Sequence, residues 1–221
     1  MIESNSWKKI AIAGTAGRKE DADKLHPTLY ASMQDVTLEL IQRIIQPGES
    51  VHLISGGAAY ADHLAVRLFL AGHVQKLTLH LPCEWDPKRK TLADTGEFNW
   101  VKNPGGTANA LHRAFQRKIK INPFEEIAQA IADPRCEVTV SKGFHARNSL
   151  MAEADVLIAE TFGKGCVVKD GGTANTCETY LKRIAKAGLP DLSWHIDLNQ
   201  SPPKAHAGIK LPEKPKAPPV W

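Results

Sequence analysis

Three short turns rich in small residues contain the groups best suited to hold an anion. They are Gly14-Thr15-Ala16-Gly17-Arg18, Ser55-Gly56-Gly57-Ala58, and the segment from Asp170 to Thr176. Glycine lets the backbone approach a ligand closely, and the N–H groups at the start of a following helix attract negative charge. One such turn is weak evidence, because glycine also serves plain tight turns. Three comparable turns together predict a site for a phosphorylated ligand.

The spacing of these residues excludes two common phosphate-binding motifs. The first turn matches neither the P-loop pattern G-x-x-x-x-G-K-[ST] nor the dinucleotide pattern G-x-G-x-x-G. The expected ligand is therefore a mononucleotide or a similar phosphorylated sugar. Ser55 has no G-x-S-x-G context, so we do not expect it to act as a nucleophile.

The spacing of the cysteines and histidines indicates neither a metal site nor a disulfide framework. The four cysteines form no C-x-x-C pair, and the histidines show no H-x-x-x-H spacing. We expect reduced thiols, no metal and no cofactor. His112 and Arg113, which follow a second Gly-Gly-Thr-Ala-Asn string, are expected to be exposed helix residues.

Apolar periodicity predicts the elements that would position the turns. The expected strands are Trp7–Ala13, Val51–Ile54, Leu77–Leu81, Glu137–Val140, Asp155–Ala159 and Leu192–Leu198. The expected helices are Thr28–Ile45, Ala58–Ala71, Ala108–Ile121, Pro123–Ala132, Asn148–Ala154 and Thr173–Ala187. This alternation predicts an α/β fold with a single Rossmann-like, doubly wound, mainly parallel sheet and helices on both faces. Ligands bind such sheets at the carboxyl ends of the strands.

Length and composition are those of one folded unit. The chain has 221 residues, 43% of them hydrophobic and 24% charged, which excludes collagen-like and wholly disordered classes. We assign residues 1–199 to one nucleotide-binding domain, with residues 83–142 as a divergent or inserted region. Residues 200–221 are rich in proline and lysine and are expected to form an extended tail that packs against no core.

Charge and hydropathy bear on partners and location. Most of the net charge of +4 falls in the tail, so nucleic acid is not favoured as a partner. No apolar run is long enough to span a membrane and the first residues do not resemble a signal peptide, so we expect a cytoplasmic protein without a membrane partner.

Two segments carry a resemblance to a known superfamily. Ser55-Gly56-Gly57-Ala58-Ala59-Tyr60-Ala61-Asp62 resembles the S-G-G-A-x-G-A-D signature of the SLOG superfamily, with Tyr60 in place of a glycine. This superfamily includes the Lonely Guy phosphoribohydrolases, YspA-type proteins and the DNA-processing protein A fold. Arg147-Asn148-Ser149-Leu150-Met151, followed by Ala154 to Ala159, resembles its R-N/K-x-x-M and A/S-D-x-x-I-A segment.

The third turn extends the resemblance. Asp170 to Glu178 is similar to the Lonely Guy loop P-G-G-x-G-T-x-x-E, with departures at Asp170, Ala174 and Asn175. With the turns above, the resemblance implies a set of ligand-binding residues: Gly14, Thr15, Gly17, Arg18, Ser55, Gly56, Gly57, Asp62, Asn148, Gly171, Gly172, Thr173, Asn175 and Thr176. Asp62 is expected to order its loop or to bind a sugar hydroxyl.

The same resemblance implies an enzyme that cleaves the N-glycosidic bond of a nucleoside 5′-monophosphate. Such a reaction builds positive charge on the sugar and negative charge on the departing base. Glu178 is then expected to stabilise the sugar, and Arg147 to hold the leaving group or the phosphate. A non-catalytic nucleotide sensor and a single-stranded DNA-binding protein remain alternatives. By the same resemblance, a homodimer is expected.

Overall fold

Strand β1 (Trp7–Gly14) lies at the centre of the sheet, and its alternate residues face two separate hydrophobic cores. The structure is a computed structural model and describes residues 6–213. Ile10 and Ile12 pack into the larger core, and Ala11 and Ala13 pack into the smaller one. Successive side chains of a strand point to opposite faces, so a continuous apolar run fits a strand that is covered on both sides.

A seven-stranded sheet extends from β1 in both directions. Its strands, in spatial order, are β6 (Cys136–Val140), β3 (Lys76–Leu81), β2 (Ser50–Ser55), β1, β7 (Val156–Thr161), β8 (Ser193–Asp197) and β9 (Lys204–Ala207). All neighbours are parallel except β8 and β9. Ile10 pairs with Leu53 of β2 and with Val156 of β7. A separate small hairpin joins β4 (Trp85–Asp86) to β5 (Thr91–Leu92).

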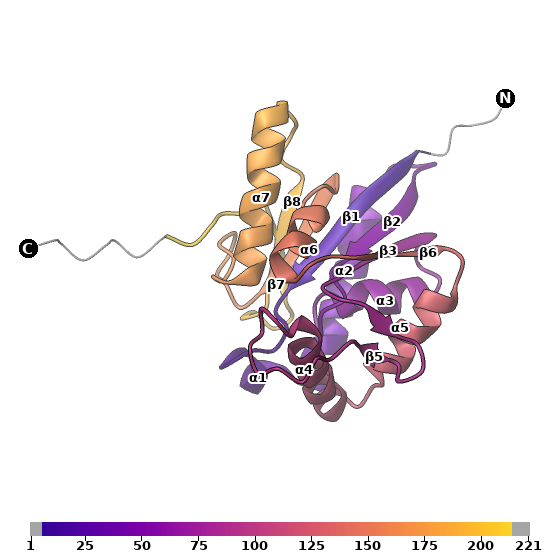
Figure 1. The fold of residues 1–221 in the computed structure, drawn as a ribbon. Coiled ribbons are helices and arrows are strands. Elements are labelled where there is room, and N and C mark those ends of the chain that lie inside the picture. Colours follow the sequence, from indigo (N-terminus) through magenta and orange to yellow (C-terminus); the bar gives the residue numbers. More distant parts are fainter. Residues whose placement is uncertain (1–5, 214–221) are drawn as a thin grey trace, which may run out of the picture.

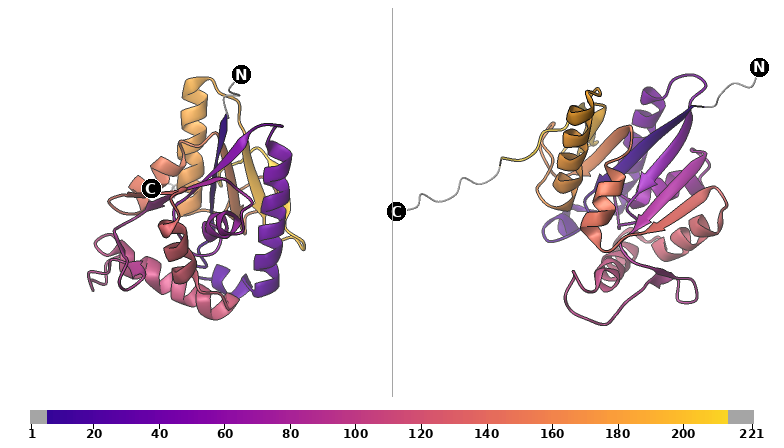
Figure 2. Two further views of the ribbon diagram at one scale, coloured as in Figure 1. Left: turned by 90° about the vertical axis from the view of Figure 1, so that its right-hand side faces the viewer. Right: turned by 45° about the horizontal axis from the view of Figure 1, so that its top comes forward.

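Helices cover both faces of this sheet (Figure 1). The larger core receives side chains from α2 (Pro27–Ile44), α3 (His63–Leu70), α4 (Pro104–Ile119) and α5 (Pro123–Ala132). The smaller core receives them from α6 (Phe144–Met151) and α7 (Gly172–Ala187), while α1 (Asp21–Lys24) is a single turn. The left view of Figure 2 places α2 and α7 on opposite sides of the sheet. The predicted Rossmann-like α/β class is confirmed.

Several predicted helix starts differ from the structure. The helix expected from Ala58 begins only at His63, because Tyr60 has a left-handed φ of 60° that interrupts helical geometry. The helix expected from Asn148 begins four residues earlier, at Phe144, directly after Gly143 with φ of 89°. α4 begins at Pro104, where the Asn103 side chain accepts a hydrogen bond from the Gly106 N–H as a helix cap.

The expectation that residues 200–221 pack against no core is wrong for the described part of that segment. β9 adds an antiparallel edge strand to β8, and Ile209 is buried in the smaller core. The backbone of Lys210 also exchanges hydrogen bonds with the loop that holds Cys166 and Val168. Residues 214–221 lie outside the described residues. In the inserted region, β6 joins the main sheet beside β3.

Two general features complete the fold. Cys83, Cys136, Cys166 and Cys177 are free thiols. Within residues 6–213, no helix combines the length and the apolar character needed to cross a bilayer.

Candidate functional site

A cavity of about 500 Å³ opens at the carboxyl ends of the central strands. Its walls come from segments far apart in the chain, namely residues 13–21, 57–62, 144–148 and 161–176, with Pro82, Trp100, Ala108 and Leu111 completing it. The lining includes eleven of the residues singled out from the sequence: Gly14, Thr15, Arg18, Gly57, Asp62, Arg147, Asn148, Gly171, Gly172, Thr173 and Thr176. The structure therefore brings the three turns to one cavity, at the place where parallel sheets bind ligands.

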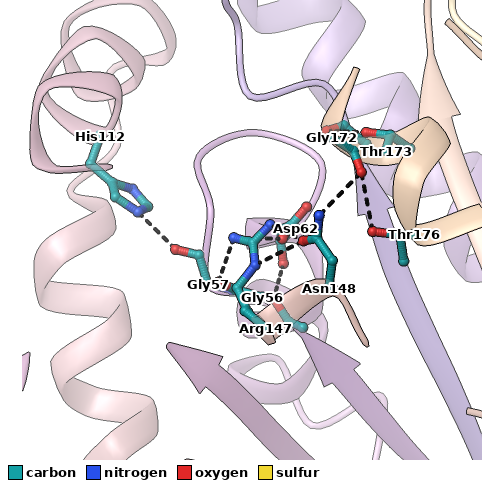
Figure 3. Close-up of polar contacts among 11 residues, drawn as sticks. Gly56, Gly57, Asp62, His112, Arg147, Asn148, Gly172, Thr173 and Thr176 are labelled. Atoms are coloured by element: carbon teal, nitrogen blue, oxygen red, sulfur yellow. Dashed lines mark hydrogen bonds and ion pairs between the residues drawn. The ribbon is translucent and has the colours of Figure 1, made fainter. Parts of the chain in front are cut away.

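Arg147 connects two of the walls. Its Nη1 donates to the carbonyl of Gly56 at 3.0 Å, and its Nε and Nη2 donate to Asn148 Oδ1 at 3.2 and 2.9 Å. A Cβ at Gly56 would lie 2.6 Å from the guanidinium carbon, so only glycine leaves room for it. Figure 3 shows the guanidinium between the Gly56 turn, Asp62 and Asn148. The absence of a side chain at Gly56 thus makes room for the Arg147 guanidinium.

Asp62 and Arg147 form a buried pair of opposite charges beside the cavity. Asp62 Oδ2 lies 3.8 Å from Arg147 Nη1, with side chains 3% and 11% exposed, respectively. Among the described residues, this Oδ2 atom accepts no hydrogen bond. Burial raises the pKa of Asp62, and the charge of Arg147 opposes that shift. The pair therefore places a buried carboxylate and a guanidinium side by side in one wall.

Helix α7 begins at the cavity and presents its N-terminus to it. Its N-cap, Gly171, has φ of 122° and makes no side-chain cap, so the first N–H groups depend on outside partners. Asn148 Nδ2 donates to the carbonyl of Gly172 at 3.2 Å, and the Thr176 hydroxyl donates to the same oxygen at 3.3 Å. Thr173 Oγ1 donates to the carbonyl of Gly14 at 2.9 Å. These contacts hold the helix start against β1 and α6.

The opposite rim is an ion-pair cluster. Lys169 Nζ lies 2.6 Å from both Glu20 Oε1 and Asp21 Oδ1. The Thr15 hydroxyl donates to Asp21 Oδ2 at 2.8 Å and accepts from the N–H of Gly17. This cluster ties the loop after β1 to the loop after β7.

Five of the residues singled out from the sequence do not line the cavity: Gly17, Ser55, Gly56, Asn175 and Glu178. Gly17 has φ of 70° and lies under the ring of Tyr60. The Ser55 hydroxyl donates to the Asp62 carbonyl at 2.8 Å and accepts from the Gly57 N–H at 3.0 Å, which orders the turn. Glu178 lies further along α7 and forms an ion pair with Lys182 at 2.8 Å.

Other residues in or beside the cavity were missed or misplaced from the sequence. His112, expected to be exposed, is buried, and its Nε2 lies 3.0 Å from the carbonyl of Gly57; Arg113 is exposed as expected. Trp100, Phe144 and Lys169 line the cavity without having been singled out. The position of Lys169 directly before the glycine turn was a usable signal, whereas Trp100 lies in a stretch without periodicity.

Fold and cavity together define a Rossmann-like α/β protein with a polar site at the carboxyl edge of its parallel sheet. The chain is 34% identical over 171 residues to the uncharacterized protein R261 of Acanthamoeba polyphaga mimivirus. The alignment covers 76% of this chain and 88% of the viral protein, so the chain belongs to the family of that protein. No protein-family model matches the sequence, and no solved structure gives a significant match.

Proposed function

We propose that this protein is a member of the SLOG superfamily that binds a nucleoside 5′-monophosphate or a related phosphorylated sugar in the cavity. The observation that carries the proposal is that three glycine-bearing turns and Arg147, from separate parts of the chain, line one cavity. Its volume of about 500 Å³ falls within the range of about 300–1,000 Å³ typical of small-molecule sites.

The walls suggest which part of the ligand each would hold. The N-terminus of α7, which the Thr173 and Thr176 hydroxyls hold in place, is suited to the phosphate because helix dipoles favour anions there. Asp62 lines the cavity beside Arg147, and its carboxylate would accept a hydrogen bond from a sugar hydroxyl there. Arg18, exposed at the rim, would add positive charge next to the phosphate.

Calorimetric titration with the four common ribonucleoside 5′-monophosphates and ribose 5-phosphate tests this proposal. We expect binding that weakens about 5- to 10-fold in Arg18→Ala, as for loss of one charge-assisted contact. Arg113→Ala is the matched control, because Arg113 is exposed and outside the cavity lining. Failure of all five ligands to bind, or equal loss in both variants, would reject the proposal.

N-glycosidic hydrolysis is a second candidate, favoured by the Asp62–Arg147 pair on one wall. In this reaction water adds its hydroxyl to C1′, the C1′–N bond breaks, and the departing base takes a proton. A carboxylate stabilises the developing positive charge on the sugar, and a cation stabilises the departing base or the phosphate. Asp62 belongs to the lining, whereas Glu178 does not.

Chromatographic detection of free base, with ribose phosphate as the second product, tests hydrolysis. If Asp62 is the carboxylate, Asp62→Asn abolishes base release and Glu178→Gln does not; the reverse pattern assigns the role to Glu178. Recovery of intact nucleotide from a wild-type protein that binds it leaves a sensor or sequestering role in place of an enzyme. Sedimentation velocity on the same samples tests the expected homodimer.

A further inference from the structure

An aromatic surface lies at the rim of the cavity on the side of the inserted region. Trp100, Phe144 and His145 all line the cavity. The ring centroids of Trp100 and Phe144 are 6.1 Å apart with an interplanar angle of 35°, and those of Trp100 and His145 are 6.2 Å apart. These three residues are called the aromatic rim below.

Trp100 is not a core residue. It is 49% exposed, and its loop neighbours Phe98 and Val101 are more exposed still, at 107% and 63%. Within the described chain, Trp100 belongs to neither hydrophobic core, although Phe144 packs partly against the larger one. A large indole left half-exposed at the edge of a polar cavity has apolar surface available to a ligand.

Two guanidinium groups extend this surface. The guanidinium carbons of Arg18 and Arg147 each lie 5.6 Å from the centroid of the Phe144 ring. Aromatic rings and arginine side chains are the surfaces on which nucleobases stack. The aromatic rim shares Arg147 with the polar wall formed by Asp62 and Asn148. A nucleotide bound to that wall could therefore reach the aromatic rim with its other end.

We propose that the aromatic rim, with Trp100 as its main contact, is the stacking site for the base of the bound nucleotide. This inference rests on the proposed function and narrows it, since the ligand is then a nucleotide with an intact base and not a sugar phosphate alone. The base stacks on Trp100 while the phosphate lies at the start of α7.

Paired titrations of wild-type protein and Trp100→Ala with the four ribonucleoside 5′-monophosphates and with ribose 5-phosphate test this assignment. Stacking on one aromatic side chain corresponds to a change of about 5- to 150-fold in affinity. We expect Trp100→Ala to lose that factor for the tightest nucleotide and to bind ribose 5-phosphate as the wild type does. Trp100→Phe should recover most of the loss, and nucleotide binding should quench the fluorescence of the wild type more than that of Trp100→Phe.

Phe98→Ala is the matched control, because Phe98 lies on the same loop, is fully exposed and does not line the cavity. Equal affinities of wild type and Trp100→Ala for every nucleotide, or an equal loss for nucleotide and ribose 5-phosphate, would overturn the stacking assignment while leaving the proposed binding function in place. If no ligand binds the wild type, both proposals fail.

Discussion

Glu160 is a fully buried carboxyl group at the end of β7, next to Thr161 in the cavity wall. The Thr37 hydroxyl donates to its Oε1 at 2.6 Å, and among residues 6–213 no group bonds its Oε2. Burial raises the pKa of Glu160 from 4.5 to about 8, and the Thr37 hydrogen bond only partly opposes this. The folded protein therefore holds this proton over a pH range in which the unfolded chain has lost it.

Because the folded state retains the Glu160 proton, we expect the free energy of unfolding to fall as the pH rises from about 4.5 to about 8. In that interval the folded state binds one more proton, so the free energy of unfolding drops by about 1.4 kcal/mol per pH unit at most. Glu160→Gln mimics the protonated form and should flatten the slope, giving its largest relative gain above pH 8. Urea denaturation at several pH values measures this, and an unchanged slope in Glu160→Gln would contradict it.

Asn148 is the positioning residue of the site. It accepts two hydrogen bonds from Arg147 and donates one to Gly172, which links α6 to the start of α7. Asn148→Ala should cost about 1–3 kcal/mol of stability, because buried donors lose their partner. Asn148→Asp keeps the acceptor for Arg147, replaces the donor to Gly172 with a carboxylate oxygen, and adds a negative charge.

Comparing the two variants separates the roles of Asn148. We expect Asn148→Asp to lose about 1–3 kcal/mol of stability, because its carboxylate oxygen faces the Gly172 carbonyl with no donor between them. Unlike Asn148→Ala, it should also bind phosphorylated ligands more weakly, because it adds a negative charge beside the proposed anion site. Thermal unfolding with and without nucleotide reports both quantities. Tighter nucleotide binding by Asn148→Asp than by wild type would be inconsistent with an anion site at the start of α7.

At the level of elements, Tyr60 sets where α3 begins. Its φ of 60° belongs to the left-handed region, which favours glycine, and glycine is the residue that the resembling signature carries there. The ring is 2% exposed and packs on Phe115 at a centroid distance of 4.4 Å, with Gly17 beneath it. Burial of the ring offsets the backbone strain of about 1–3 kcal/mol.

Tyr60→Gly is therefore predicted to lower stability in spite of relieving strain. Loss of a large buried aromatic ring costs about 3–5 kcal/mol, which exceeds the strain released. Tyr60→Phe keeps the ring and should remain near wild type. Chemical denaturation of the three proteins measures the difference, and a Tyr60→Gly protein more stable than wild type would show that strain dominates.

The elements also show what could be predicted from the sequence and what could not. α5 matches its predicted bounds, because Asn122, Pro123 and the apolar periodicity are local signals. The start of α3 was mispredicted because an L-residue at positive φ is stabilised by contacts with distant residues. β9 was missed because a short edge strand needs no apolar pattern, only free backbone groups on β8.

Some features of the candidate site could likewise be predicted from the sequence, and others could not. Glycine-bearing turns that follow strands were recognisable, since the fold class places all carboxyl ends on one side. The pairing of Arg147 with the Gly56 carbonyl and the location of Trp100 depend on how separate loops pack. The helical periodicity of α7 explains why Thr173 and Thr176, rather than Glu178, face the cavity, although all three belong to one motif.

On the scale of the whole molecule, residues 204–210 pack against β8 and against the loop that carries Lys169. Ile209 is 5% exposed, and its N–H donates to Ser193 Oγ at 2.9 Å. Lys210 accepts from the N–H of Val168, in the loop that carries Lys169. Removal of this segment would expose the edge of β8 and free one side of the cavity loop.

A chain that ends at Asn199 is therefore predicted to be less stable than a chain that ends at Glu213 and to bind ligand poorly. Loss of the buried Ile209 side chain alone corresponds to about 2–5 kcal/mol. Circular dichroism during heating and titration with nucleotide compare the two chains. Equal melting temperatures would contradict the structural role assigned to β9 and Ile209.

The central position of β1 governs when the cavity can exist during synthesis. β1 is synthesised well before β7, one of its two neighbours, so Ile10 cannot pair with Val156 until β7 has been made. The last segment that lines the cavity, residues 161–176, is synthesised after the other lining segments. Native pairings of such long sequence separation form slowly. A nascent chain therefore cannot bind the proposed ligand co-translationally until β7 and the start of α7 have been made.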